Sequence, residues 1–227
     1  MRTLNKLTLI TGLLLLNIAF LQAEDAACPD AEKSSAQVMA EKTEKTDDTK
    51  DAVKNPHYGE NVVNVAFESW HLLSVGHEHN YYVAPQMISV IWQLDDVGLD
   101  GWLRGNTAWT FSALYSPVFT GPENRMIGTC WGPRYNFVQP GWDIVPYAES
   151  RLGILFTDST GVADAQGQDF CFQFMVSIGM QYYFDESWSV QLSANYQHIS
   201  NSGLSEPEHK NVGLDIIGPG VAVLYQF

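Results

Sequence analysis

The sequence predicts an all-β fold, an eight-stranded antiparallel β-barrel, and three observations lead to that prediction. From Tyr58 onward, aromatic and β-branched residues alternate with small and polar ones. Clusters of Gly, Pro, Asn and Asp interrupt the alternation at short intervals, as turns between antiparallel strands do. The alternating segments number eight, and an even count is typical of a barrel that closes on itself.

The sixth of these segments shows the pattern most clearly. Between Phe170 and Tyr183 the even positions are all apolar or aromatic, whereas the odd positions include Gln173, Ser177 and Gln181. Successive side chains of a strand point to opposite faces, so one face of this segment suits lipid and the other a half-polar interior. The eight predicted strands lie at about 61–73, 81–94, 102–117, 125–137, 143–157, 170–184, 188–200 and 213–227.

Two architectures compete for such a chain: a soluble sandwich or lipocalin-like barrel, and a transmembrane barrel of the outer membrane. Membrane strands run about 9–11 residues and carry aromatic girdles at both interfaces. The predicted strands are that long or longer, and the run Val221–Phe227 ends on an aromatic residue, which resembles the C-terminal signature of outer-membrane barrels. The outer-membrane barrel is therefore favoured. Its outward-facing girdle residues are Tyr82, Trp92, Trp109, Tyr115, Trp131, Tyr135, Trp188 and Tyr196.

Two segments precede the barrel domain, which is predicted for residues 58–227. Residues 1–23 read as a secretory signal peptide, with a basic start, an apolar run from Leu7 to Leu21 and a small-residue exit. Residues 24–57 contain nine acidic residues and five lysines but almost no large apolar side chains. Such a composition cannot bury enough surface to offset the entropy of ordering, so we expect a disordered, periplasmic tail.

Charge and metal-ligand spacing exclude several kinds of partner. The barrel domain carries 17 acidic and five basic residues, which argues against nucleic-acid binding because Lys and Arg on phosphate drive that binding. His77 and His79, near His71, form an i, i+2 pair, but no third metal ligand follows from the spacing. We expect a solvated loop there, and no metal or other cofactor.

Several interior features also follow from the pattern. Glu149 and Arg151 point inward by parity, so we expect an ion pair that fills the lumen, because eight strands enclose only enough space for side chains. Cys130 and Cys171 are expected to be small buried side chains, with a disulfide as the alternative. Proline cannot donate to a β-ladder, so a bulge or local gap is expected in the last strand at residues 218–220, Gly-Pro-Gly.

Three residues with catalytic chemistry share the outward face at one end of the last hairpin. In the seventh strand the apolar parity of residues 188–196 continues to His198 and Ser200, and in the eighth the parity of Phe227 leads back to Asp215. These are the components of a serine hydrolase: a nucleophile, a base that takes its proton, and a carboxylate that fixes the imidazole tautomer. The alternative is that the strands have left the hydrocarbon and the three are interfacial polar residues.

The residues around this triad resemble a known family. The stretches Tyr196-Gln-His-Ile-Ser-Asn-Ser-Gly-Leu204 and Asn211-Val-Gly-Leu-Asp215, before a closing strand that ends in Phe, resemble the outer-membrane lipid A 3-O-deacylases of the PagL type. That family's motif reads His-x-Ser-Asn-Ala-Gly, then Asn-Pro-Gly, then an acid. Weaker likenesses at 145–149 and 172–179 extend the resemblance to about the last 85 residues.

The resemblance implies a serine esterase, a carboxylic ester hydrolase that removes an ester-linked acyl chain of lipid A in lipopolysaccharide. It implies His198 as the base, Ser200 as the nucleophile and Asp215 at the position of the acid. It also suggests that Asn201, Gly203 and Asn211 order the loop or form the oxyanion site. A homodimer is left open. The alternative is a non-catalytic small barrel of the OmpX or OmpW kind, with a structural or adhesion role.

The sequence departs from the family's motif at several positions. Ser202 stands where alanine is usual, Val212 replaces the proline, and the loop is longer than typical. The acid is Asp215, whereas the family has Glu. Aspartate is one methylene shorter, so a hydrogen bond to His198 requires a closer approach of the two backbones.

Overall fold

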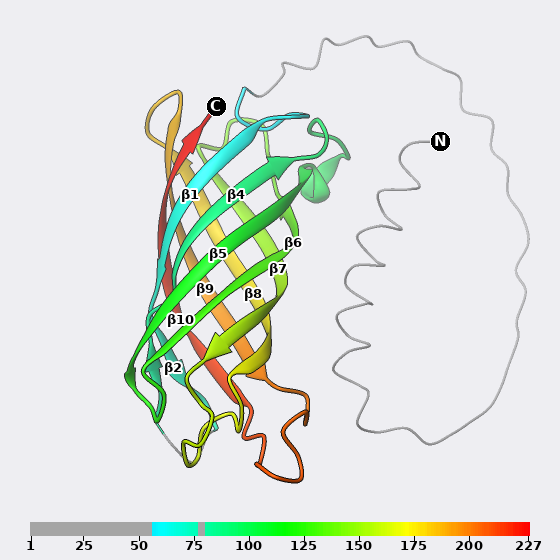
Figure 1. Ribbon diagram of the computed structural model, residues 1–227. Helices are drawn as coiled ribbons and strands as arrows, with labels where there is room; N and C mark the ends of the chain where they lie inside the picture. The colour runs from blue at the N-terminus through cyan, green and yellow to red at the C-terminus, as the bar shows by residue number, and fades with distance from the viewer. Residues whose placement is uncertain (1–55, 77–79) are drawn as a thin grey trace, which may run out of the picture. The chain divides into compact units, whose positions relative to one another are not determined.

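The computed structural model describes residues 56–76 and 80–227, and Figure 1 shows the strands wrapped into a barrel. The main strands of the barrel are long and tilted. The only helical element in the described residues is a single turn of 3-10 helix, η1 (Gly101–Leu103). The strands are β1 (Val63–Trp70), β2 (Leu72–Ser74), β3 (Tyr82–Val83), β4 (Gln86–Gln93), β5 (Asn106–Thr120), β6 (Arg125–Asn136), β7 (Ile144–Thr157), β8 (Phe170–Tyr183), β9 (Trp188–Ser200) and β10 (Leu214–Gln226).

The strands form one closed, eight-stranded antiparallel barrel, as predicted. β1 and β2 are two parts of the first strand, and β3 and β4 are two parts of the second. Each strand pairs with its neighbour in the chain, and β1 closes the ring by pairing with β10. The third strand differs most from the prediction: it runs from Asn106 to Thr120 rather than from about 102 to 117, and its start is later because Gly101–Leu103 form η1.

The two ends of the barrel differ in what they carry. Val63 and Phe227 lie at one end, which we call the terminal end, joined by a hydrogen bond of 3.0 Å from the Phe227 N–H to the Val63 carbonyl. The loops 158–169 and 201–213 lie at the opposite end, which we call the loop end (Figure 1). No helix of the described residues is long and apolar enough to cross a membrane.

The outward face of the barrel is apolar and exposed. Burial alternates along every long strand, as β9 illustrates: Leu192 is 59% exposed, whereas its neighbour Gln191 is buried. The predicted girdle residues all lie on the outward parity, and at the terminal end Trp188 contacts Tyr225 with ring centroids 5.0 Å apart. Exposed apolar side chains on all sides of a barrel fit contact with lipid.

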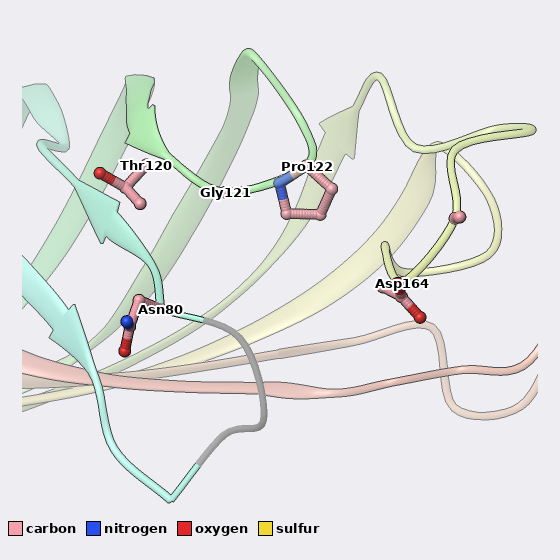
Figure 2. Close-up of a pocket in the computed structure, with 6 residues that line it drawn as sticks. Asn80, Thr120, Gly121, Pro122 and Asp164 are labelled. Carbon is pink, nitrogen blue, oxygen red and sulfur yellow. The ribbon is translucent and has the colours of Figure 1, made fainter.

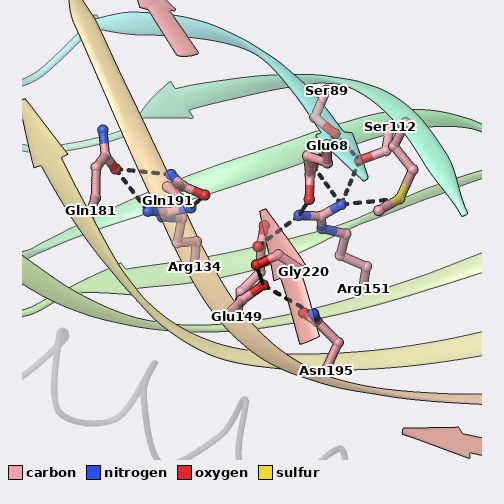
Figure 3. Close-up of polar contacts among 12 residues, drawn as sticks. Glu68, Ser89, Ser112, Arg134, Glu149, Arg151, Gln181, Gln191, Asn195 and Gly220 are labelled. Carbon is pink, nitrogen blue, oxygen red and sulfur yellow. Dashed lines mark hydrogen bonds and ion pairs between the residues drawn. The ribbon is translucent and has the colours of Figure 1, made fainter. Parts of the chain in front are cut away.

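The interior holds a buried ionic network (Figure 3). Arg151 contacts Glu149 at 2.8 Å and Glu68 at 3.0 Å, and its Nη1 also donates to the Ser112 hydroxyl at 3.0 Å. The predicted pair of Glu149 and Arg151 is therefore confirmed, and Glu68, from the opposite wall, adds a second carboxylate. Toward the loop end the lumen is filled by apolar side chains that include Trp70, Leu72 and Met175.

Pro219 lies in β10, which is continuous, but it coincides with a break in the neighbouring first strand. The register between β9 and β10 runs without a shift from Leu214 to Tyr225, so no bulge forms there. The Pro219 carbonyl accepts from His71 N at 2.9 Å, and the nitrogen of a strand residue faces the same neighbour as its carbonyl. The missing N–H of Pro219 therefore faces His71, the residue at which the first strand divides into β1 and β2. The predicted gap is confirmed and lies on this side.

Cys130 and Cys171 are buried and free, which confirms the simpler prediction for them. The predicted signal peptide, the predicted tail up to residue 55 and the histidines at 77 and 79 lie outside the described residues.

Candidate active site

Strand pairing brings the three predicted catalytic residues together at the loop end. His198 and Ser200 are the third-last and last residues of β9, and Asp215 is the second residue of β10. The register places Asp215 directly opposite His198. All three side chains are partly exposed, while Ile199, between His198 and Ser200, and its partner Leu214, which precedes Asp215, are fully buried. The triad therefore lies on the outward face, as the parity argument predicts.

Asp215 and His198 are hydrogen bonded. His198 Nδ1 lies 2.8 Å from Asp215 Oδ1, and the two side chains are 41% and 47% exposed. A carboxylate at Nδ1 favours the tautomer that carries its proton there, which leaves Nε2 able to accept a proton. Asp215 Oδ1 also accepts a hydrogen bond of 2.5 Å from the hydroxyl of Tyr196. The sequence placed Tyr196 in the aromatic girdle, and its position two residues before His198 on the same face was the signal for this contact.

The hydroxyl of Ser200 is held by the loop that follows it. Asn211 Nδ2 donates to Ser200 Oγ at 3.0 Å, and the backbone N–H of Ser202 donates to it at 3.1 Å. Among the described residues no hydrogen bond joins Ser200 and His198. In enzymes without substrate, the hydrogen bond between nucleophile and base is often long and tightens only in the complex. The i, i+2 spacing places Ser200 and His198 on the same face of β9, where such a bond can form.

Asn201 and Gly203 order the loop between β9 and β10. The Asn201 side chain is fully buried and donates to the Gln166 carbonyl at 2.6 Å and to Ser205 Oγ at 2.7 Å. Its Oδ1 accepts from the Gly203 N–H at 2.8 Å. These contacts tie the loop to the neighbouring loop 158–169 and occupy the Gly203 N–H. Loop contacts have no periodic signal in a sequence, so Gln166 and Ser205 could not be predicted.

Asn211 connects this ordered loop to Ser200. Its Oδ1 accepts from the Asn201 N–H at 3.3 Å while its Nδ2 points at the Ser200 hydroxyl. Glu206 Oε1 accepts from the Asn211 N–H at 3.4 Å. Glu206 therefore supports Asn211, and it is Asp215 that contacts His198.

Aromatic side chains border Ser200 on the side away from Asp215. Phe172 of β8 lies opposite Ser200 in the register and is 41% exposed. Its ring lies 5.1 Å from that of Phe170, which lies 5.5 Å from that of Phe156 in β7. A hydrocarbon chain that reached Ser200 from the membrane would therefore meet an apolar surface.

An open hollow of about 320 Å³ lies elsewhere among the loops (Figure 2). It is lined by Asn80, Thr120, Gly121, Pro122, Ala163 and Asp164, none of which belongs to the predicted site. The predicted site is instead a row of side chains on the outward wall of the barrel. Among the described residues, no three or more His, Cys, Asp or Glu side chains gather in a way that could hold a metal ion.

Comparisons with known proteins agree with this fold. The chain resembles the crystal structure of the outer membrane enzyme PagL, with a TM-score of 0.53 and 18% identity over 70% of this chain and 97% of that one. It resembles the crystal structure of Neisserial surface protein A with a TM-score of 0.53 and 16% identity, over 74% of this chain and 100% of that one. At these identities the likenesses establish the fold alone, that of barrels from the outer membrane.

No curated protein sequence matches the chain significantly. The family model described as lipid A 3-O-deacylase (PagL), in contrast, matches residues 86–223, which is more than half of the chain. The matched range includes His198, Ser200 and Asp215. The chain therefore belongs to the lipid A 3-O-deacylase family.

Proposed function

We propose that the chain is an outer-membrane serine esterase that removes the ester-linked acyl chain at the 3-O position of lipid A, the position that the family description names. The observation that carries this proposal is the hydrogen bond of 2.8 Å between His198 and Asp215 on the outward face. His198 is two residues before Ser200 in the same strand. Polar side chains are costly against lipid. A base and a carboxylate joined there, beside a serine, are the arrangement that a lipid hydrolase needs.

The geometry supports an acyl-enzyme mechanism. Ser200 Oγ attacks the ester carbonyl and His198 Nε2 takes the hydroxyl proton, while Asp215 stabilises the imidazolium. His198 then protonates the departing sugar oxygen, and the acyl chain stays on Ser200. Water, deprotonated by His198, attacks this acyl-enzyme, which releases a fatty acid and restores the serine.

Asn211 and the Ser202 N–H are the proposed oxyanion donors. Both donate to Ser200 Oγ, at 3.0 and 3.1 Å. The carbonyl carbon of an ester attacked by Ser200 would be bonded to this Oγ, so the oxyanion would form within reach of the same donors. A pair of fixed donors at that place stabilises the tetrahedral intermediate. Asn201 and Gly203 are proposed to order the loop, because their own polar groups are bonded to one another.

The orientation of outer-membrane barrels supports lipid A as the substrate. In such barrels both chain ends lie on the periplasmic side. The loop end, with His198 and Ser200, then lies at the outer surface, where lipopolysaccharide forms the outer leaflet. The Phe172 side of Ser200 would contact the acyl chain.

Mass spectrometry of lipid A tests the proposal. Cells that express the wild-type chain should lose one ester-linked acyl chain from lipid A, and cells that express Ser200→Ala should not. Ser193→Ala, a change in the same strand on the inward parity, should behave as wild type. An unchanged acyl pattern with a folded wild-type barrel would favour the second candidate, a non-catalytic barrel of the OmpX or OmpW kind.

A further inference from the structure

Two donors converge on one oxygen of Asp215. His198 Nδ1 lies 2.8 Å from Oδ1, and the Tyr196 hydroxyl donates to the same atom at 2.5 Å. All three residues are partly exposed on the outward face. Tyr196 and His198 are two residues apart in β9, so their side chains point the same way and approach Asp215 from one side.

The position of Tyr196 is fixed by the register of the barrel wall. Val176 lies opposite it in β8 and Ile217 lies opposite it in β10, so its two cross-strand neighbours are apolar. Asp215 lies at a more open place, because its side chain is 47% exposed and it is only one residue inside the start of β10. A fixed donor to a carboxylate at such a place restricts rotation about the side-chain bonds of the acid.

We propose that Tyr196 is a positioning residue for the acid of the triad: its hydroxyl holds Asp215 in the orientation that bonds His198 Nδ1. The proposal rests on the proposed esterase function for its kinetic consequence, though not for the geometry. Tyr196 acts through Asp215 and does not itself contact the reacting atoms.

Few other groups surround His198 that could mimic this effect. β8 presents Phe174 opposite it, and β10 presents Asp215. The loop approaches at Gly213, where an added Cβ would lie 3.9 Å from the imidazole Cε1. The acidic loop residue Glu206 is bonded to the Asn211 backbone. Tyr196 and Asp215 are therefore the titratable groups whose contacts can orient this imidazole.

Tyr196→Phe isolates the hydroxyl, because the ring and its packing remain. We expect purified full-length barrel in detergent micelles to lose about tenfold in kcat on lipopolysaccharide, with KM little changed, since one hydrogen bond to a charged group is removed. Tyr182→Phe is the matched control: Tyr182 is an outward tyrosine of β8, 46% exposed, opposite Val190 near the terminal end. It should retain wild-type kcat.

The double variant separates action through Asp215 from a general effect on the wall. In an Asp215→Asn background, Tyr196→Phe should lower kcat little further, because the carboxylate that it positions is gone. The proposal would be overturned if Tyr196→Phe lowered kcat by the same factor in the wild-type and Asp215→Asn backgrounds. Wild-type kcat in Tyr196→Phe alone would also overturn it.

A tautomer measurement tests the geometry without any turnover. Nitrogen-15 spectra of the neutral imidazole of His198, assigned with a His198→Gln variant, distinguish a proton on Nδ1 from one on Nε2. We expect the Nδ1–H tautomer to dominate in the wild type and in Tyr182→Phe, and the Nε2–H tautomer to grow in Tyr196→Phe and in Asp215→Asn. A tautomer ratio that Tyr196→Phe leaves unchanged would overturn the positioning role. A changed ratio in a protein without deacylase activity would support that role and refute the esterase.

Discussion

Asp215 and His198 face one another as a pair that exchanges no backbone hydrogen bonds. The Asp215 carbonyl accepts instead from Val75 N, on the side of β2, at 2.9 Å. In an antiparallel sheet such pairs bring the Cα atoms to about 4.5 Å, a full ångström closer than hydrogen-bonded pairs. The closer approach that the shorter aspartate requires is thus supplied by the register, and the bond to His198 reaches 2.8 Å without the extra methylene of glutamate.

Asp215→Asn should leave the barrel folded and lower deacylation strongly, because an amide can hold the wrong imidazole tautomer. The corresponding change in a well-studied serine protease triad lowers kcat by about 10⁴-fold. Release of fatty acid from lipopolysaccharide by the purified barrel measures the effect. Undiminished release would mean that Ser200 and His198 act as a dyad or use another carboxylate.

Three further variants identify the acid. Glu206→Gln and Glu208→Gln should keep nearly full activity, because neither carboxylate contacts His198 in the structure. Glu206→Gln also keeps the Oε1 that accepts from the Asn211 N–H. Asp215→Glu should remain active but should not exceed the wild type, since the existing hydrogen bond is not stretched. If either glutamine variant lost as much activity as Asp215→Asn, the assignment of Asp215 as the acid would be wrong.

Asn211→Asp should abolish most of the activity, because it removes the Nδ2–H donor beside Ser200. The loop 201–213 should keep its structure. The aspartate keeps the Oδ1 that accepts from the Asn201 N–H but has no Nδ2–H to donate beside Ser200. Loss of one oxyanion donor costs about 10²–10³ in kcat. Steady-state kinetics on lipopolysaccharide would measure this loss in kcat, with Asn211→Ala as a comparison. Activity retained in the aspartate but lost in the alanine would assign Asn211 to loop order alone.

Arg151→Met should destabilise the barrel, because it leaves Glu68 and Glu149 buried without their shared cation. Breaking a buried ion pair on one side costs about 3–5 kcal/mol. Guanidinium unfolding followed by tryptophan fluorescence gives the free energy of unfolding. Adding Glu68→Gln and Glu149→Gln to the same variant should recover much of the loss. A free energy unchanged by Arg151→Met would show that the network adds nothing to stability.

Cysteine scanning of β9 tests the outward face of the site. Cysteines at Val190, Leu192 and Ala194 should react with a lipid-soluble maleimide in liposomes, and cysteines at Gln191 and Ser193 should not, all in a background without Cys28, Cys130 and Cys171. The reverse pattern would show a shift of one residue, which turns every side chain of a strand to the other face. That result would place His198 and Ser200 inside the barrel.

Much of the fold followed from the sequence because side chains alternate with a period of two. That alternation alone located the strands and placed His198, Ser200 and Asp215 on one face. Contacts across the lumen could not be predicted in the same way, since they depend on closure of the ring. Arg151 meets Glu68, 83 residues away, only because β1 and β7 enclose the same interior.

The details of the site depended on groups that have no periodic signal. The loop 201–213 turns the Asn211 amide onto Ser200 through contacts with Asn201, and no pattern of residue types encodes that direction. The contact of Tyr196 with Asp215 was missed for a different reason, although its parity places Tyr196 on the same face as His198. A tyrosine near a strand end suits the membrane interface, and this common role accounts for its presence without any contact to Asp215.

We also expect Pro219 to act before the barrel closes. Until β1 pairs with β10, one side of β10 is a free edge whose N–H and C=O groups can bind a strand of another molecule. Pro219 lacks its donor on that side, so a foreign strand cannot form an unbroken ladder along it. We expect Pro219→Val to scatter more light than the wild type during refolding from urea into micelles, and equal scattering would confine the role of Pro219 to the gap at His71. We therefore expect Pro219, which divides the first strand, to protect the last strand against aggregation until the barrel closes.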